Sequence, residues 1–205
     1  MRPAVRAFTL SIVMLLAVSV SAAAATPRAD ISSAGPLTHV YLGNELSCQV
    51  DRSGAKQLYP TGNTPGDCGT FASYGGTLYK PDFVGHGGST ATDMAATGAV
   101  FTPVSQSAVT GAGTIASPYR VVTVVTAGPK LRMTQTETYV TGDEHWLTRL
   151  DVENLDSAPL TTSIYRAMDC FLGGADIGYG YKDVSSGGVG CSAAPDNSPA
   201  GVVEP

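Results

Sequence analysis

The segment Tyr119–Thr126 has the sequence YRVVTVVT, and the segment Leu131–Val140 has the sequence LRMTQTETYV. Both are rich in β-branched residues, which pack well on a pleated sheet and are less favourable in helices. Gly128-Pro129 breaks the chain between them and is typical of a turn. These segments predict two neighbouring antiparallel strands at the centre of a β-sheet.

Two further strands follow in the same pattern. The segment Trp146–Glu153 alternates between two sets of residues, and successive side chains of a strand point to opposite faces. We expect the set Trp146, Thr148, Leu150 and Val152 to face the core. Arg149 and Glu153 belong to the other set and should face solvent. The segment Leu160–Tyr165 alternates similarly after a turn, so four successive strands predict an antiparallel meander.

The segments before this meander favour the same class of fold. Thr38–Leu42 and Leu46–Val50 flank the turn dipeptide Gly43-Asn44, and Phe71–Tyr74 and Thr77–Lys80 flank Gly75-Gly76. The chain contains 24 glycines and 13 prolines, which suits short strands joined by turns. We therefore predict an all-β protein, an antiparallel β-sandwich with long Gly/Pro-rich loops, over residues 36–190.

The N-terminus has the pattern of an export signal. Arg2 and Arg6 precede the apolar run Ala7–Val20, and small residues follow it in Ser21–Ala25. We expect residues 1–25 to be a signal peptide and the mature protein to be secreted and extracellular. The apolar run is shorter than the roughly 20 residues that span a membrane, so we expect no membrane span after cleavage.

The segments at the two ends of the predicted sandwich are richer in small and polar residues. We expect residues 26–35 to form a flexible lead-in and residues 191–205 to form an irregular Gly/Ser/Pro-rich tail. This tail offers no strand to close a sheet edge. The pattern is consistent with a truncated gene product or with a requirement for a partner.

The four cysteines predict disulfides. An even number of cysteines in an exported chain is typical of a disulfide framework, and four cysteines permit three pairings. We favour Cys48 with Cys68 and Cys170 with Cys191, because each pair is local and closes a loop rich in turn residues. A metal site is the alternative, but the chain has no C-x-x-C pair.

The net charge of −5 argues against a nucleic-acid partner, since such partners require clusters of basic residues. Only 14% of the residues are charged, while 43% are hydrophobic, so the chain can form a core.

Four segments resemble a family of uncharacterised secreted bacterial surface proteins. They are THVYLGNELSCQVD (Thr38–Asp51), TPGDCGT (Thr64–Thr70), SPYRVVTVV (Ser117–Val125) and YRAMDC with GGADIGYG (Tyr165–Gly180). The resemblance implies export and a β-sandwich domain. The stretch LTRLDVENLDSAPLTTSIYR is also loosely similar to galactose-mutarotase-like and immunoglobulin-like sandwiches. Neither resemblance supplies catalytic residues.

A search for catalytic motifs gives no strong candidate. The chain lacks the G-x-S-x-G pattern of serine hydrolases and the H-E-x-x-H pattern of zinc enzymes. The histidines, His39, His86 and His145, are far apart in sequence. Acidic residues around His145 keep a carbohydrate-active enzyme of mutarotase-like type open as an alternative. We therefore name no catalytic residue and favour a non-catalytic protein.

The glycine-rich segment Gly173–Asp183 holds the predicted ligand-binding residues. Tyr179 and Tyr181 are separated by one glycine, so an extended chain places both rings on one side, where they can stack on sugars. Asp176 would add an acceptor for sugar hydroxyls. Asp169, Asp176 and Asp183 recur every seven residues and are candidate ligands for Ca²⁺.

These features predict a secreted module that binds glycan or another cell-surface polymer. Two alternatives remain beside the enzyme. Both tyrosines could pack the loop against the sandwich, and the protein could be a purely structural component of the envelope.

Overall fold

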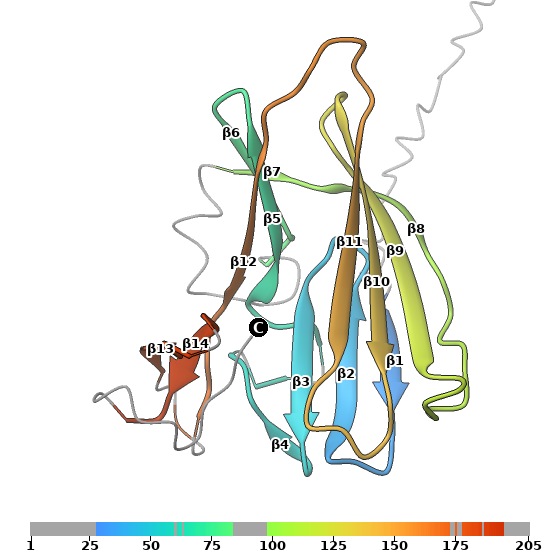
Figure 1. Ribbon diagram of the computed structural model, residues 1–205, viewed down its shortest axis with the longest axis vertical. Helices are drawn as coiled ribbons and strands as arrows, with labels where there is room; N and C mark the ends of the chain where they lie inside the picture. The colour runs from blue at the N-terminus through green and yellow to red at the C-terminus, as the bar shows by residue number, and fades with distance from the viewer. Residues whose placement is uncertain are drawn as a thin grey trace, which may run out of the picture.

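The computed structural model describes residues 28–59, 61–62, 64–83, 98–172, 175, 178–185 and 187–194. These residues form strands, turns and loops, and none of them is helical (Figure 1). The strands are β1 (Arg28–Ser32), β2 (Leu37–Gly43), β3 (Cys48–Arg52), β4 (Ala55–Lys56), β5 (Cys68–Tyr74), β6 (Thr77–Lys80), β7 (Ala99–Val100), β8 (Thr102–Gln106), β9 (Tyr119–Ala127), β10 (Leu131–Tyr139), β11 (Leu147–Asn154), β12 (Ser163–Met168), β13 (Tyr179–Lys182) and β14 (Val189–Ser192). The all-β prediction is confirmed.

The strands form three four-stranded sheets and one hairpin. The N-terminal sheet has the order β1-β2-β3-β4, the long sheet β11-β10-β9-β8 and the mixed sheet β12-β5-β6-β7, while β13 pairs with β14. Neighbouring strands are antiparallel except β6 and β7, which are parallel.

The long sheet packs against both of the other sheets. Val121 and Tyr139 of the long sheet share one apolar core with the N-terminal sheet. Val125 and Met133 share a second core with the mixed sheet. In Figure 1 the N-terminal sheet lies beside the lower half of the long sheet and the mixed sheet beside its upper half. The arrangement is therefore sandwich-like, as the sequence predicts.

The predicted central hairpin is present. Residues of β9 and β10 alternate between buried and half-buried positions, and Thr134 pairs with Val124. Gly128 lies in the connecting turn with a φ of 54°, and a Cβ there would approach the Tyr79 hydroxyl oxygen to 2.5 Å. A glycine is required at this turn for both reasons.

The predicted register of the next strand is confirmed for most of its positions. Trp146 and Leu150 pack partly buried against the two cores, and Arg149 is exposed. The prediction is wrong for Val152, which is 43% exposed. The physical reason is that β11 is the edge strand of the long sheet, so its inward side chains are covered on one side only.

Two predicted boundaries need correction. Residues 26–35 are not a flexible lead-in, because β1 pairs with β2 and buries Ala29 and Ile31 inside the first core. An apolar residue at every second position gives even this short segment a buried face. At the other end, β14 crosses residue 191, so the irregular tail does not begin there.

Both predicted disulfides are present. Cys48 is joined to Cys68 inside the first core, with 5.0 Å between their Cα atoms, and Cys170 is joined to Cys191. Two disulfides are typical of proteins from an oxidising compartment. No helix long and apolar enough to cross a membrane occurs among the residues that the structure describes.

Candidate functional site

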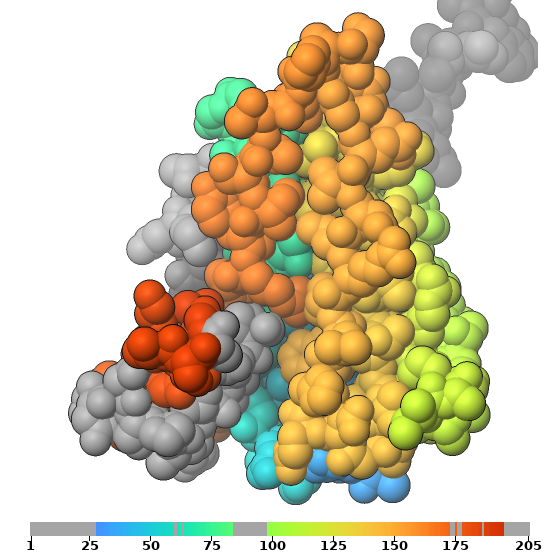
Figure 2. Space-filling view, viewed as in Figure 1, coloured from blue at the N-terminus to red at the C-terminus, as the bar shows by residue number. Residues whose placement is uncertain are grey.

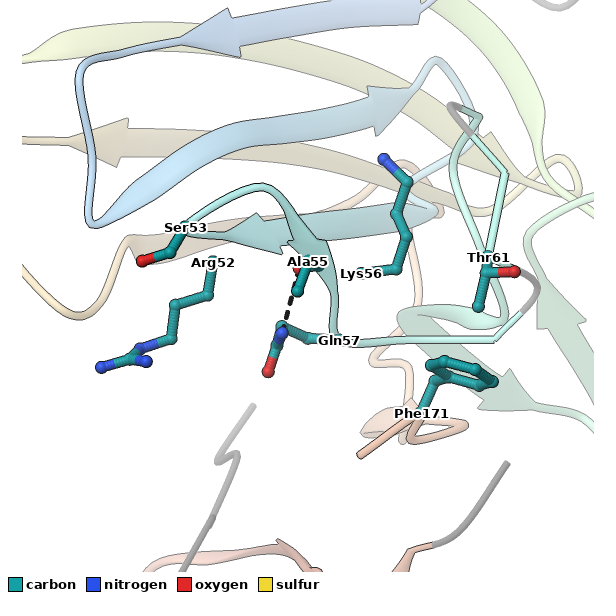
Figure 3. A pocket seen from close by; sticks show the side chains of 7 residues that line it. All are labelled: Arg52, Ser53, Ala55, Lys56, Gln57, Thr61 and Phe171. Atoms are coloured by element: carbon teal, nitrogen blue, oxygen red, sulfur yellow. Dashed lines mark hydrogen bonds between the residues drawn. The ribbon is translucent and has the colours of Figure 1, made fainter. Parts of the chain in front are cut away.

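An open groove of about 500 Å³ lies beside the β3–β4 hairpin. Seven described residues line it, and none of them is acidic (Figure 3). They are Arg52, Ser53, Ala55, Lys56, Gln57, Thr61 and Phe171. The groove therefore combines one aromatic ring with an amide, two hydroxyl groups and two basic side chains.

Backbone hydrogen bonds hold Phe171 at this groove. The N–H group of Phe171 donates to the carbonyl oxygen of Gln57 at 2.9 Å, and Leu58 forms an isolated bridge with Cys170. One step further, the N–H group of Tyr59 donates to the carbonyl oxygen of Asp169 at 2.9 Å. Two segments that are more than a hundred residues apart in sequence are thus fixed side by side.

The Cys170–Cys191 disulfide ties the hairpin β13–β14 to the same segment. Gly178 lies against this disulfide, because a Cβ at that position would come within 2.7 Å of the Cβ of Cys170. A side chain at Gly178 would therefore push the start of the hairpin away from the bridge. Phe171 and the hairpin share one covalent anchor.

The predicted aromatic pair lies on this hairpin. Tyr179 and Tyr181 both belong to β13, and Gly180 separates them, so their side chains leave the strand on the same face. Tyr179 is 45% exposed, and Tyr181 is half-buried. The third predicted ligand-binding residue, Asp176, lies outside the described residues.

The two basic side chains of the groove have acidic partners outside it. The Arg52 guanidinium donates to both carboxylate oxygens of Glu144, at 2.7 and 2.9 Å. This pair raises the pKa of Arg52 and lowers the pKa of Glu144. The Lys56 ammonium lies 2.6 Å from Asp51 and 4.7 Å from the centre of the Tyr41 ring. Because both charges are compensated, the groove suits an uncharged ligand.

The predicted calcium ligands are only partly described. The Asp183 carboxylate accepts hydrogen bonds from the backbone N–H and the hydroxyl of Ser185, both at 2.8 Å, within the turn between β13 and β14. No group of three metal-ligating side chains occurs in the described ranges. Since Asp176 is not among them, calcium binding by Asp169, Asp176 and Asp183 stays a prediction.

The described histidines lie apart from the groove lining. His39 on β2 contacts the Asp30 carboxylate at 3.0 Å on the half-exposed face of the N-terminal sheet. His145 is exposed between β10 and β11, and His86 lies outside the described residues. The contacts described for His39 therefore join it to one carboxylate, whereas the mutarotase-like alternative calls for a histidine and two carboxylates in one pocket.

A buried polar network between the sheets was not predicted. The Arg166 guanidinium donates to the Thr70 hydroxyl, which donates to the Gln135 side-chain oxygen. The Gln135 amide and the Thr148 hydroxyl each donate to the Glu137 carboxylate, at 2.6 and 2.7 Å. The network crosses from the mixed sheet to the long sheet.

Glu137 is the charged centre of this network. It is 2% exposed, and its burial raises the pKa of the carboxyl group, while the positive charge of Arg166 opposes that shift. Because Glu137 is enclosed, it stabilises the junction of the sheets and is not placed to meet a ligand. The sequence held one signal for it, since Gln135 and Glu137 share strand parity with the apolar Met133.

No protein-family model, no curated protein and no solved structure matches this chain. The conclusions that follow rest on the residues themselves.

Proposed function

We propose that this chain is an exported, non-catalytic β-sandwich module that binds glycan, and that the groove at Phe171 is the binding site. The observation that carries the proposal is the position of the Phe171 ring beside Gln57 and Thr61 in an open, uncharged groove. Aromatic rings stack on the apolar faces of sugars, while amides and hydroxyls bond their hydroxyl groups. A few polar groups in a mainly apolar pocket are typical of a ligand site.

Two other features support the same proposal. The pattern of residues 1–25 and the two disulfides suit an extracellular protein, in whose surroundings polysaccharides are common ligands. The exposed ring of Tyr179 lies on the hairpin that shares the Cys170–Cys191 anchor with Phe171, so it offers a second stacking surface. The ligand class that fits best is a neutral polysaccharide, because the basic side chains of the groove are already paired.

A polysaccharide array tests this function directly. We expect the oxidised protein to bind one or more neutral polysaccharides, and we expect the sugar to be recovered unchanged. Release of smaller sugars or a change of anomeric form during incubation would contradict a non-catalytic role and favour the mutarotase-like alternative. Absence of binding to every polysaccharide would contradict the proposed function and favour a structural role.

Phe171→Ala should weaken glycan binding at least about tenfold, because one stacked ring contributes on the order of 1 kcal/mol or more. Tyr165→Ala is the matched control, since Tyr165 is an aromatic side chain that is 50% exposed on β12 and does not line the groove. Isothermal titration of both variants with the array ligand measures the effect. Equal affinities for the two variants would remove Phe171 from the site.

The double variant Tyr179→Ala/Tyr181→Ala separates two roles for the hairpin. A loss of affinity with an unchanged melting temperature is the expected result for Tyr179, whose ring is exposed. Since Tyr181 is half-buried, a single Tyr181→Ala variant should account for any loss of stability. A large fall in melting temperature with unchanged affinity would show that both rings serve only to pack the hairpin.

A further inference from the structure

The long sheet ends in an uncovered edge at β11. This strand of eight residues pairs with β10 on one side, and no described strand pairs with its other side. An edge strand presents a row of N–H and C=O groups that can pair with another strand. Figure 2 shows the side chains of this part of the chain on the front surface of the molecule.

β11 lacks some of the features that usually protect an edge. It is regular over its whole length, with every residue from Leu147 to Thr138's neighbour in register, and its ladder to β10 contains no bulge. Leu147 is 62% exposed and Val152 is 43% exposed, so apolar side chains are uncovered on both faces of the strand. A long, regular edge with exposed apolar groups favours association.

The charges of β11 indicate which partner fits. Arg149 and Asp151 lie on the outer face of the strand, one residue on each side of Leu150, and their side chains are exposed. When two identical strands pair antiparallel about a two-fold axis at Leu150, each Arg149 lies directly opposite Asp151 of the second copy. Opposite charges at directly opposed positions stabilise a strand pair.

The same register also suits the inner face. Leu150 then lies opposite Leu150 of the second copy, and Thr148 lies opposite Val152. The exposed part of Val152 thereby gains a neighbour, while Leu150 continues the apolar layer that it already joins in the second core. A shift of the register by one residue would place Arg149 opposite Leu150 and lose both charge pairs.

We propose that this chain forms a symmetric dimer by antiparallel pairing of β11 with β11 of a second copy, centred on Leu150. The two long sheets then form one continuous sheet across the two-fold axis. This inference does not depend on glycan binding, because the groove at Phe171 is lined by residues outside β11. Two copies would present two grooves, which raises the avidity for a polymer with repeating units.

Charge exchange at the pairing centre tests the dimer. Sedimentation equilibrium of the oxidised protein from about 1 µM to about 1 mM should show a monomer–dimer equilibrium. Arg149→Asp leaves only carboxylates at positions 149 and 151 of both copies and should raise the dissociation constant at least about tenfold. The double variant Arg149→Asp/Asp151→Arg restores opposite charges in the same register and should return the dissociation constant toward that of the wild type.

Arg120→Asp is the matched control, because Arg120 is exposed on β9, which is an inner strand of the same sheet. It should leave the dimer unchanged. A wild type that stays monomeric at all concentrations would overturn the proposal, as would a double variant as weak as Arg149→Asp. Capture of a different protein by β11, with the wild type alone monomeric, would show that the edge serves another partner and would also overturn it.

Discussion

Replacing Cys48 and Cys68 together by alanine is expected to lower the free energy of unfolding by about 3 kcal/mol. The bridge closes a loop with a sequence separation of 20, and a loop of that size contributes roughly 3 kcal/mol by restricting the unfolded chain. Both cysteines are 1% exposed and belong to the first core, so loss of packing adds to the effect. Urea denaturation of the oxidised variant and the wild type measures the difference.

The second disulfide provides the matched comparison. Cys170 and Cys191 have a separation of 21, so the chain-entropy contribution is nearly the same, but they lie outside the three apolar cores. Replacing this pair by alanine should cost less global stability and should weaken glycan binding, because Phe171 and the hairpin lose their shared anchor. Equal losses of stability for the two pairs, with unchanged affinity, would contradict this division of roles.

Arg166→Met is expected to lower the free energy of unfolding by about 3 kcal/mol at neutral pH, since removing one member of a buried charged network leaves the other uncompensated. The group left behind is Glu137, which is 2% exposed. The second substitution Glu137→Gln, added to Arg166→Met, should recover much of the loss because it removes the buried charge. A double variant no more stable than Arg166→Met would contradict a role for the Glu137 charge.

The single variant Glu137→Gln tests the sign of the pH dependence. The pKa of Glu137 is raised in the folded state, so the folded protein holds the proton more tightly than the unfolded chain. The carboxyl group therefore stabilises the fold most below its unfolded pKa, and this contribution is lost as the pH rises through the folded pKa. The stability of Glu137→Gln relative to the wild type should increase with pH over this window. A difference that is independent of pH would show that the pKa is not raised.

The sequence predicted those parts of the fold that depend on local patterns. Alternation over β9 and β10 and the turn at Gly128 were sufficient for the central hairpin, because one face of each strand is buried. The local disulfide pairing also followed from spacing. β1 was missed because its buried face consists of only Ala29 and Ile31, a signal too short to separate from a loop.

The site depended on contacts that local patterns do not contain. Phe171 reaches Gln57 through a backbone hydrogen bond between distant segments, and nothing near Phe171 in the sequence indicates the groove. The buried network joins Arg166 of the mixed sheet to Glu137 of the long sheet through Thr70 and Gln135. Such pairs follow from the way in which sheets pack, which the alternation of a single strand does not determine.

Hydrogen–deuterium exchange with and without the polysaccharide selected by the array is the most direct test of the proposed binding site. Ligand should slow exchange at the backbone amides of residues 52–59 and of Phe171, and it should leave β9 and β10 unchanged. Slowed exchange on the hairpin at Tyr179 would extend the site as proposed. Protection confined to another surface, with none at Phe171, would contradict the assignment of this groove as the glycan-binding site.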